Sequence, residues 1–152
     1  MTISNDKEFK ATLAALNDSE RRRVATLLVQ QVLELSGDAR VKGGLDLAGR
    51  ADAGSAELEV AAAGVNTARV ESFTQCGRDT DWAAQASHFV ARAAQECVRP
   101  VVDLVAAWEA AMQARMARMC KTLAAGEGTD NSEAAAQYRV MDAFLKAKGS
   151  GS

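Results

Sequence analysis

The chain has 152 residues, of which 48% are hydrophobic and 25% are charged. This length and composition are typical of one globular domain and exclude a disordered chain. The net charge is −2, so no overall field attracts nucleic acid or an anionic membrane. No apolar run approaches the roughly 18 residues that a membrane span requires. We therefore expect a soluble domain over residues 1–148 that binds neither nucleic acid nor a membrane. Residues 149–152 are expected to be an expression linker.

The composition also favours helices over strands. About one residue in five is alanine, only 5% are aromatic, and there is one proline. No alternating pattern is longer than three residues, so the sequence predicts an all-α bundle of six or seven helices. The N-terminus is polar and the three cysteines are widely spaced, which indicates a cytoplasmic protein with reduced thiols.

Capping residues divide the first half of the chain into four expected helices. Asn5 or Asp6 begins the first, and Asn17 with Glu20 forms a capping box for the second, which we expect to reach Ser36. Asp38 begins the third helix. A Gly-Ser break at 54–55 begins the fourth, which runs to about residue 75. Apolar residues surround the fourth helix over 58–65, so we expect it at the centre of the bundle.

The second half predicts three further helices. A turn at 76–79 precedes a fifth helix over 82–98, and Pro100 suits the first turn of a sixth that reaches about Ala125. A glycine-rich loop at 126–129 separates it from a last helix capped by Asp130. Large apolar residues recur along the sixth helix and predict its buried side: Val101, Leu104, Val105, Trp108, Met112, Met116, Met119 and Leu123.

The opposite side of the sixth helix is rich in alanine and nearly free of charge. It consists of Ala106, Ala107, Ala110, Ala114 and Ala117. A helix that is apolar on two sides needs a neighbour on each side. The neighbour on the alanine side is either another helix of the same chain or a second molecule. We therefore treat this alanine face as a candidate surface for a protein partner or a homodimer.

Sulfur-containing side chains suggest a second candidate site. Met112, Met116, Met119 and Cys120 lie on adjacent turns of the expected sixth helix, and Cys97 ends the fifth. Thioethers and thiols are ligands for soft metals and also line adaptable ligand pockets. The simpler interpretation is core packing, because these methionines continue the apolar seam.

The remaining reactive residues do not form a recognisable catalytic or metal-binding set. Cys76 lies in a turn before a helix N-terminus, which favours thiolate and makes it a redox candidate, although Asp79 and Asp81 oppose this effect. The only histidine, His88, falls on the polar face of the fifth helix. One histidine supplies neither a zinc or di-iron ligand set nor a recognisable triad, so we expect no metal and no cofactor, and an enzyme is the third hypothesis after protein binding and ligand binding.

Arg21, Arg22 and Arg23 form the only dense basic run. Such a run can contact phosphate or an acidic protein surface, and it also occurs on solvated helix faces. No aromatic residues are interleaved with it, as they would be in a nucleic-acid site.

Residues 32–98 resemble the all-α immunity proteins encoded beside bacterial polymorphic toxins, the immunity protein five-like family. The resemblance consists of Asp38-Ala39-Arg40 before Leu45 and Ala48, then the Gly-Ser break and alanine-rich helices. Family members tend to have proline where this chain has Ala39. The resemblance implies a non-catalytic protein that acts by docking. Our leading hypothesis is accordingly a protein-binding module, and the alternative is a bundle that binds a small ligand or soft metal near the methionines.

Overall fold

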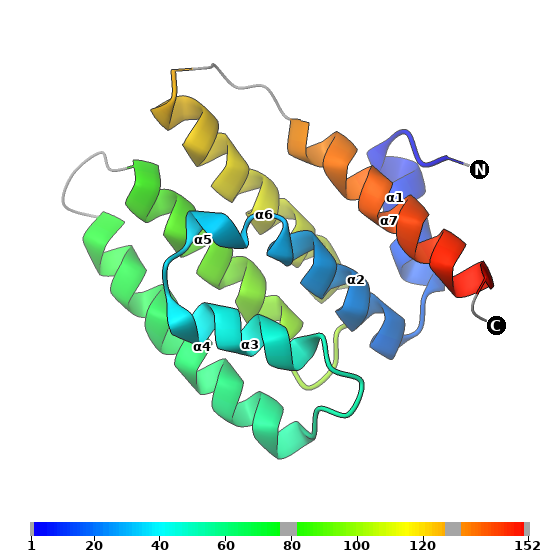
Figure 1. Cartoon of the computed structure of the whole chain (residues 1–152), viewed down its shortest axis with the longest axis horizontal. Coiled ribbons are helices and arrows are strands. Elements are labelled where there is room, and N and C mark those ends of the chain that lie inside the picture. The colour runs from blue at the N-terminus through cyan, green and yellow to red at the C-terminus, as the bar shows by residue number, and fades with distance from the viewer. Residues whose placement is uncertain (1, 77–81, 127–131, 151–152) are drawn as a thin grey trace.

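The computed structural model describes residues 2–76, 82–126 and 132–150. Within these ranges the chain forms seven α-helices, a short 3-10 turn and no strand, which confirms the all-α bundle (Figure 1). The helices are α1 (Asp6–Ala15), α2 (Asp18–Gln30), α3 (Ala39–Ala48), α4 (Ser55–Cys76), α5 (Trp82–Cys97), α6 (Leu104–Ala124) and α7 (Ser132–Ser150), with η1 (Leu33–Leu35) after α2. No helix in the described part of the chain has the length and apolar character needed to cross a membrane.

Local hydrogen bonds begin the first three helices where the sequence predicts. The Asn5 side chain accepts from the Glu8 backbone N–H and caps α1. Asn17 and Glu20 form both bonds of the capping box at the start of α2, at 2.8 and 3.0 Å. Asp38 accepts from the Arg40 N–H and caps α3. These caps satisfy N–H groups that have no partner within the helix.

Helices α4, α5 and α6 lie side by side, and α2 and α3 form a second layer in front of them (Figure 1). Helices α1 and α7 pack against α6 on the side away from α5. The pair α5 and α6 has the most extensive contact, and α5 also touches α2, α3, α4 and η1. Helix α5 is therefore the centre of the bundle.

The expectation that α4 is central is wrong. Leu58, Val65 and Ala68 are buried on one side of α4, whereas Val60 is 75% exposed on the other. Much of the apolar belt over 58–65 is alanine, which loses little by remaining in water. An apolar residue on each side of a helix therefore does not require a neighbour on each side.

Helix α6 buries the side opposite to the one we expected. Its alanine face is fully covered, while Val105 is 69% exposed and Met116 is 40% exposed. Alanine side chains let the backbones of α5 and α6 approach closely, so this face forms the tight central contact. The larger side chains lie towards the periphery, where Trp108 packs against Phe9 of α1.

Helix α6 is also shorter than the sequence predicts. It begins at Leu104 rather than Pro100, because the Asp103 carboxylate accepts from the Ala106 N–H at 2.9 Å and caps it there. The helix has 21 residues instead of roughly 26. Residues 98–103 form a connection outside the helix, and that connection contributes to the site described below.

A polar network joins α1, α6 and α7 at one side of the bundle. The buried Arg115 guanidinium donates two hydrogen bonds to Asp6, at 2.7 and 3.1 Å, and one to Gln137 at 2.7 Å. The Tyr138 hydroxyl also donates to Asp6, at 2.7 Å. Helix α7 continues to Ser150, so the first two residues of the predicted linker belong to this helix.

Candidate functional site

The two first arginines of the basic run hold neighbouring segments in place. Arg21 donates from Nε to the Val102 carbonyl at 3.0 Å, and its Nη1 donates to the Leu16 carbonyl. It also pairs with Asp18. Arg21 therefore ties the end of α1 and the α5–α6 connection to the start of α2.

Arg22 caps the carboxyl end of α5. Its Nη1 donates to the carbonyls of Cys97 and Arg99 at 2.6 and 2.7 Å, and its Nη2 donates to the Pro100 carbonyl at 3.0 Å. These carbonyls lack partners within the helix, and the negative end of the helix dipole attracts the cation. Burial lowers the pKa of Arg22 from its ordinary value. The guanidinium therefore remains attached to neutral acceptors in a half-buried position.

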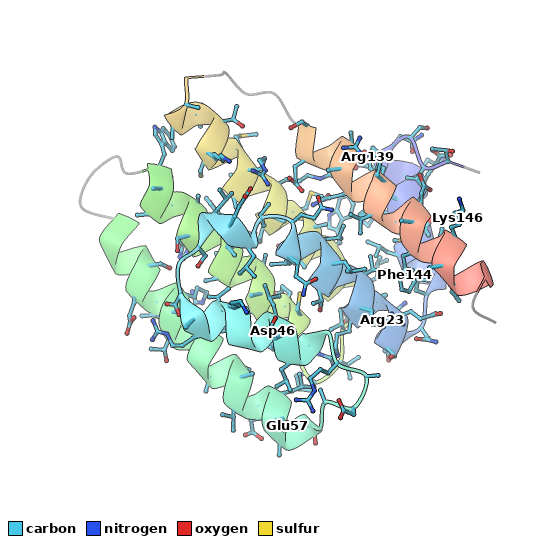
Figure 2. All side chains as sticks on the ribbon, viewed as in Figure 1. Arg23, Asp46, Glu57, Arg139, Phe144 and Lys146 are labelled. Carbon is cyan, nitrogen blue, oxygen red and sulfur yellow. The ribbon has the colours of Figure 1, made fainter. Side chains whose placement is uncertain are left out.

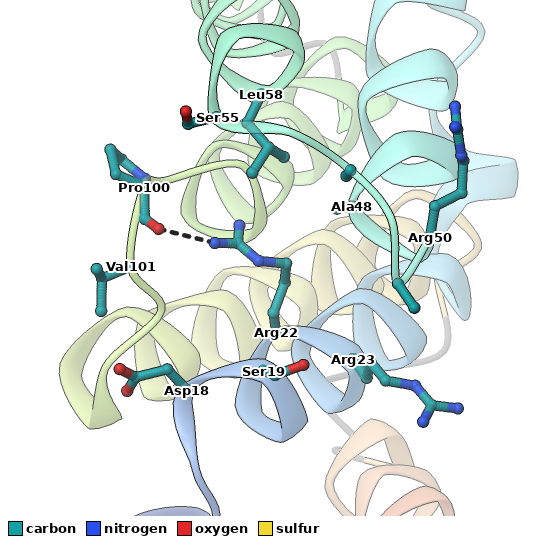
Figure 3. Close-up of a pocket in the computed structure, with 12 residues that line it drawn as sticks. Asp18, Ser19, Arg22, Arg23, Ala48, Arg50, Ser55, Leu58, Pro100 and Val101 are labelled. Carbon is teal, nitrogen blue, oxygen red and sulfur yellow. Dashed lines mark hydrogen bonds between the residues drawn. The ribbon is translucent and has the colours of Figure 1, made fainter.

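Arg23 leaves α2 in a different direction from Arg22 (Figure 3). Its guanidinium carbon lies 5.6 Å from the centroid of the Phe144 ring of α7, an arrangement that positions the cation without neutralising it. No carboxylate of the described residues lies within salt-bridge distance of Arg23. Figure 2 shows Arg23 and Phe144 on the same face of the molecule, where α2 passes α7.

Three cavities adjoin Arg23. The largest, of about 390 Å³, lies between the start of α2, the α3–α4 connection and the α5–α6 connection (Figure 3). A second, of about 270 Å³, lies between α2 and α7, and a third, of about 140 Å³, follows α2 towards Gln30. We call this surface the α2 groove. Its lining from α2 consists of Asp18, Ser19, Glu20, Arg22, Arg23, Thr26, Leu27 and Gln30.

The walls of the α2 groove come from α3, α4, α7 and the connections between helices. One wall carries Arg50, and the opposite wall carries Lys148. Arg50 pairs with Asp52 at 3.1 Å, and Lys148 pairs with Glu20 across α2 and α7 at 2.6 Å. Leu27 lies one turn after Arg23 and is 41% exposed. The groove therefore combines an exposed apolar side chain with Arg23, a cation that influences Glu20 through space but forms no salt bridge with a described carboxylate.

The predicted partner surface on the sixth helix is not exposed. Its five alanines are buried within the chain: Ala106, Ala107, Ala110, Ala114 and Ala117. Helix α5 covers this face, since α5 and α6 form the most extensive contact in the fold. A partner therefore has no access to these residues in the folded chain.

The structure separates the sulfur-containing residues of the second candidate site. Cys97 and Cys120 are buried, whereas Met116 is exposed, and Met112 and Met119 are half-buried. Cys97 ends α5 close to the start of α6, while Cys120 lies 16 residues beyond Leu104, about 24 Å along that helix. None of the three groove cavities includes any of the five.

The thiols have different surroundings. Burial raises the pKa of Cys97 to about 12, and its Sγ lies 3.6 Å from the Ala93 carbonyl, so this thiol is not a nucleophile at neutral pH. Cys76 is the last residue of α4, and its side chain lies outside the described part of the structure, as do Asp79 and Asp81. The redox prediction for Cys76 therefore stays a prediction.

His88 is buried, contrary to the expectation of a solvated side chain. Its Nδ1 lies 3.1 Å from Ser72 Oγ and 3.2 Å from the Arg69 carbonyl oxygen, both on α4. Burial lowers its pKa. The Ser72 hydroxyl also lies within hydrogen-bond distance of the Arg69 carbonyl, at 2.9 Å. The histidine therefore joins α5 to α4 through Ser72 and the Arg69 carbonyl.

The Asp38 and Arg40 pair that carries the family resemblance has a structural role. Arg40 donates to Asp38 at 2.7 Å and to Glu71 of α4 at 2.6 Å. These carboxylates raise the pKa of Arg40, while Arg40 lowers the pKa of both acids. The pair therefore caps α3 and links it to α4.

Among the described residues, no group of three or more His, Cys, Asp or Glu side chains is placed to hold a metal ion. Comparison of the chain with family models, with curated proteins and with solved structures gave no match. Sequence reasoning identified the basic run but missed the groove. The available signal was the helical spacing of Ser19, Arg23, Leu27 and Gln30, which places an arginine and a leucine on one face of α2.

Proposed function

We propose that this chain is a non-enzymatic docking module that binds a protein partner through the α2 groove. The observation that carries the proposal is the exposed Leu27 beside Arg23, which forms no salt bridge with a carboxylate of the described residues. Arginine is enriched among the residues that carry most of the binding energy of protein interfaces, and burial of an exposed apolar side chain such as Leu27 adds to that energy. A role as an immunity or other accessory protein, which the resemblance implies, is one form of this activity.

The extent of the groove favours a protein segment over a compact small molecule. From Ser19 to Gln30 the lining of α2 extends over 11 residues, or about 16 Å. This length accommodates three turns of a partner helix or about five residues of extended chain. The proposal includes a cytoplasmic location, which is consistent with buried cysteines at 97 and 120 that no disulfide joins.

A capture experiment with matched variants tests the docking surface. We expect Leu27→Gln to lose the partner that the wild-type chain retains from a lysate of its source cells. The control Val60→Gln removes another exposed apolar side chain, on α4 and outside the groove cavities. Isothermal titration calorimetry with the purified partner should show binding to Leu27→Gln weakened about tenfold, and circular dichroism should show intact helices.

Two results would contradict the proposal. If Val60→Gln loses the partner and Leu27→Gln retains it, the docking surface lies on α4. If light scattering gives the purified protein the mass of a dimer and gives Leu27→Gln the mass of a monomer, the groove binds a second copy of the chain instead of another protein.

A further inference from the structure

The largest cavity of the α2 groove is positively charged in a chain whose net charge is −2. Arg22, Arg23 and Arg50 line it, and Asp18 is its only acidic residue among the lining side chains described. Asp18 is already paired with Arg21. The hydroxyl side chains of Ser19 on α2 and Ser55 at the start of α4 add hydrogen-bond donors on two sides of the same cavity.

Two of these cations retain capacity for an anion. A guanidinium has five N–H donors, and Arg22 uses three of them on backbone carbonyls. All three of these acceptors are neutral, and the nearby charge of Asp18 acts on Arg22 without a hydrogen bond between the two side chains. Arg23 contacts the ring of Phe144, and its charge helps to lower the pKa of Glu20, whose carboxylate is bonded to Lys148 and lies beyond salt-bridge distance of Arg23. Arg50 contributes less, because Asp52 and Glu57 lie 3.1 and 3.9 Å from it.

We infer that the groove recognises an acidic segment of its protein partner, with Asp or Glu carboxylates placed on Arg23 and Arg22. This inference rests on the proposed docking function and names the chemistry of the partner. The two remaining N–H groups of Arg22 match the two oxygens of one carboxylate. The length of the groove, about 16 Å, extends well beyond a single small anion and matches about five residues of a peptide.

Hexaglutamate is a suitable probe, since six extended residues span about 20 Å. We expect its addition, up to about 1 mM, to shift amide NMR signals of Ser19, Leu27, Gly49 and Ser55 in the ¹⁵N-labelled chain. Binding should weaken as salt is added, because exposed charges are screened. Hexaglutamine, which has the same length and no charge, should leave these signals in place.

Variants assign the binding to Arg23. Arg23→Gln should weaken hexaglutamate binding at least about tenfold. Arg139→Gln is the matched control, because Arg139 is exposed towards the other end of α7 and lines none of the groove cavities (Figure 2). Equal binding to wild type and Arg23→Gln overturns the inference, as does equal binding of hexaglutamate and hexaglutamine.

The two proposals fail separately. If hexaglutamate does not bind while loss of Leu27 abolishes partner binding, the acidic recognition is wrong and the docking function stands. If hexaglutamate binds at Arg23 while no partner depends on Leu27, the cavity binds acidic peptides and the docking function is wrong.

Discussion

Arg21, Arg22 and Arg23 are adjacent in the chain, but each has a different environment. Arg21 and Arg22 donate to carbonyls at the ends of α1 and α5, whereas Arg23 lies against Phe144 at the surface. Successive residues of a helix point about 100° apart, so a basic run cannot act as one charged patch. Only Arg23 keeps the exposed position that the run as a whole suggests.

This difference predicts unequal losses of stability for the same substitution at neighbouring positions. Arg22→Gln should lower the free energy of unfolding by about 2 kcal/mol, because three backbone carbonyls lose a charged donor. Arg23→Gln should lower it by less than about 1 kcal/mol, since it removes one exposed cation–π contact. Urea denaturation measures both. A larger loss at Arg23 than at Arg22 would show that the capping role of Arg22 is wrong.

At the scale of helices, close approach depends on where side chains are small. Helix α6 packs against α5 through its alanines, and α3 approaches α4 at Gly44. A Cβ atom at Gly44 would lie 2.7 Å from Val65 Cγ2, which is shorter than any ordinary contact. Val65 is fully buried and its short branched side chain has little freedom to move aside. Gly43, in contrast, has no atom within 4 Å of that position.

The adjacent glycines of α3 therefore form a matched pair for mutation. Gly43→Ala should stabilise the chain by about 0.5–1 kcal/mol, because alanine loses less conformational entropy than glycine in a helix. Gly44→Ala should destabilise it by about 1 kcal/mol, since the clash with Val65 exceeds that gain. Thermal and urea denaturation of both variants give the comparison. Stabilisation by Gly44→Ala would mean that α3 and α4 separate at little cost.

At the scale of the whole molecule, a single carboxylate connects three helices. Asp6 of α1 accepts from Arg115 of α6 and Tyr138 of α7. The hydrogen bonds from Arg115 lower the pKa of Asp6 below its ordinary value of 3.8. Because the pKa is lower in the folded chain than in the unfolded chain, the Asp6 contribution is complete above about pH 5 and is lost as the pH falls through the folded pKa.

Asp6→Asn tests this connection. At pH 7 the variant should be about 1–2 kcal/mol less stable than wild type, because the buried Arg115 loses its charged partner while Asp6 itself is half exposed. The difference should shrink as the pH falls below about 4, because the unfolded chain takes up the proton first and Asp6 of the folded chain follows at lower pH. Urea denaturation between pH 7 and pH 3 measures it. If the stability difference between wild type and Asp6→Asn stays constant over this range, the ionised Asp6 carboxylate does not stabilise the fold through Arg115.

Part of the fold can be predicted because its causes are local. The caps at Asn5, Asn17 and Asp38 use side chains within three residues of the N–H groups they satisfy, so the sequence contains both partners. The start of α6 was predicted wrongly, because Pro100 suits a first helical turn but Asp103 provides the cap. In the candidate site, the basic run was visible, but its division between Arg22 and Arg23 depends on distant carbonyls and a ring of α7.

The sequence by itself determined that the chain is helical, approximately where its helices lie, and that its alanines permit close packing. Only the tertiary structure decided that α5 lies at the centre, that α6 buries its alanine face, and that Arg23 and Leu27 remain at the surface. The reason is physical: a helix with two apolar sides is compatible with either orientation. Contacts between segments far apart in the chain select the side that allows the closest approach.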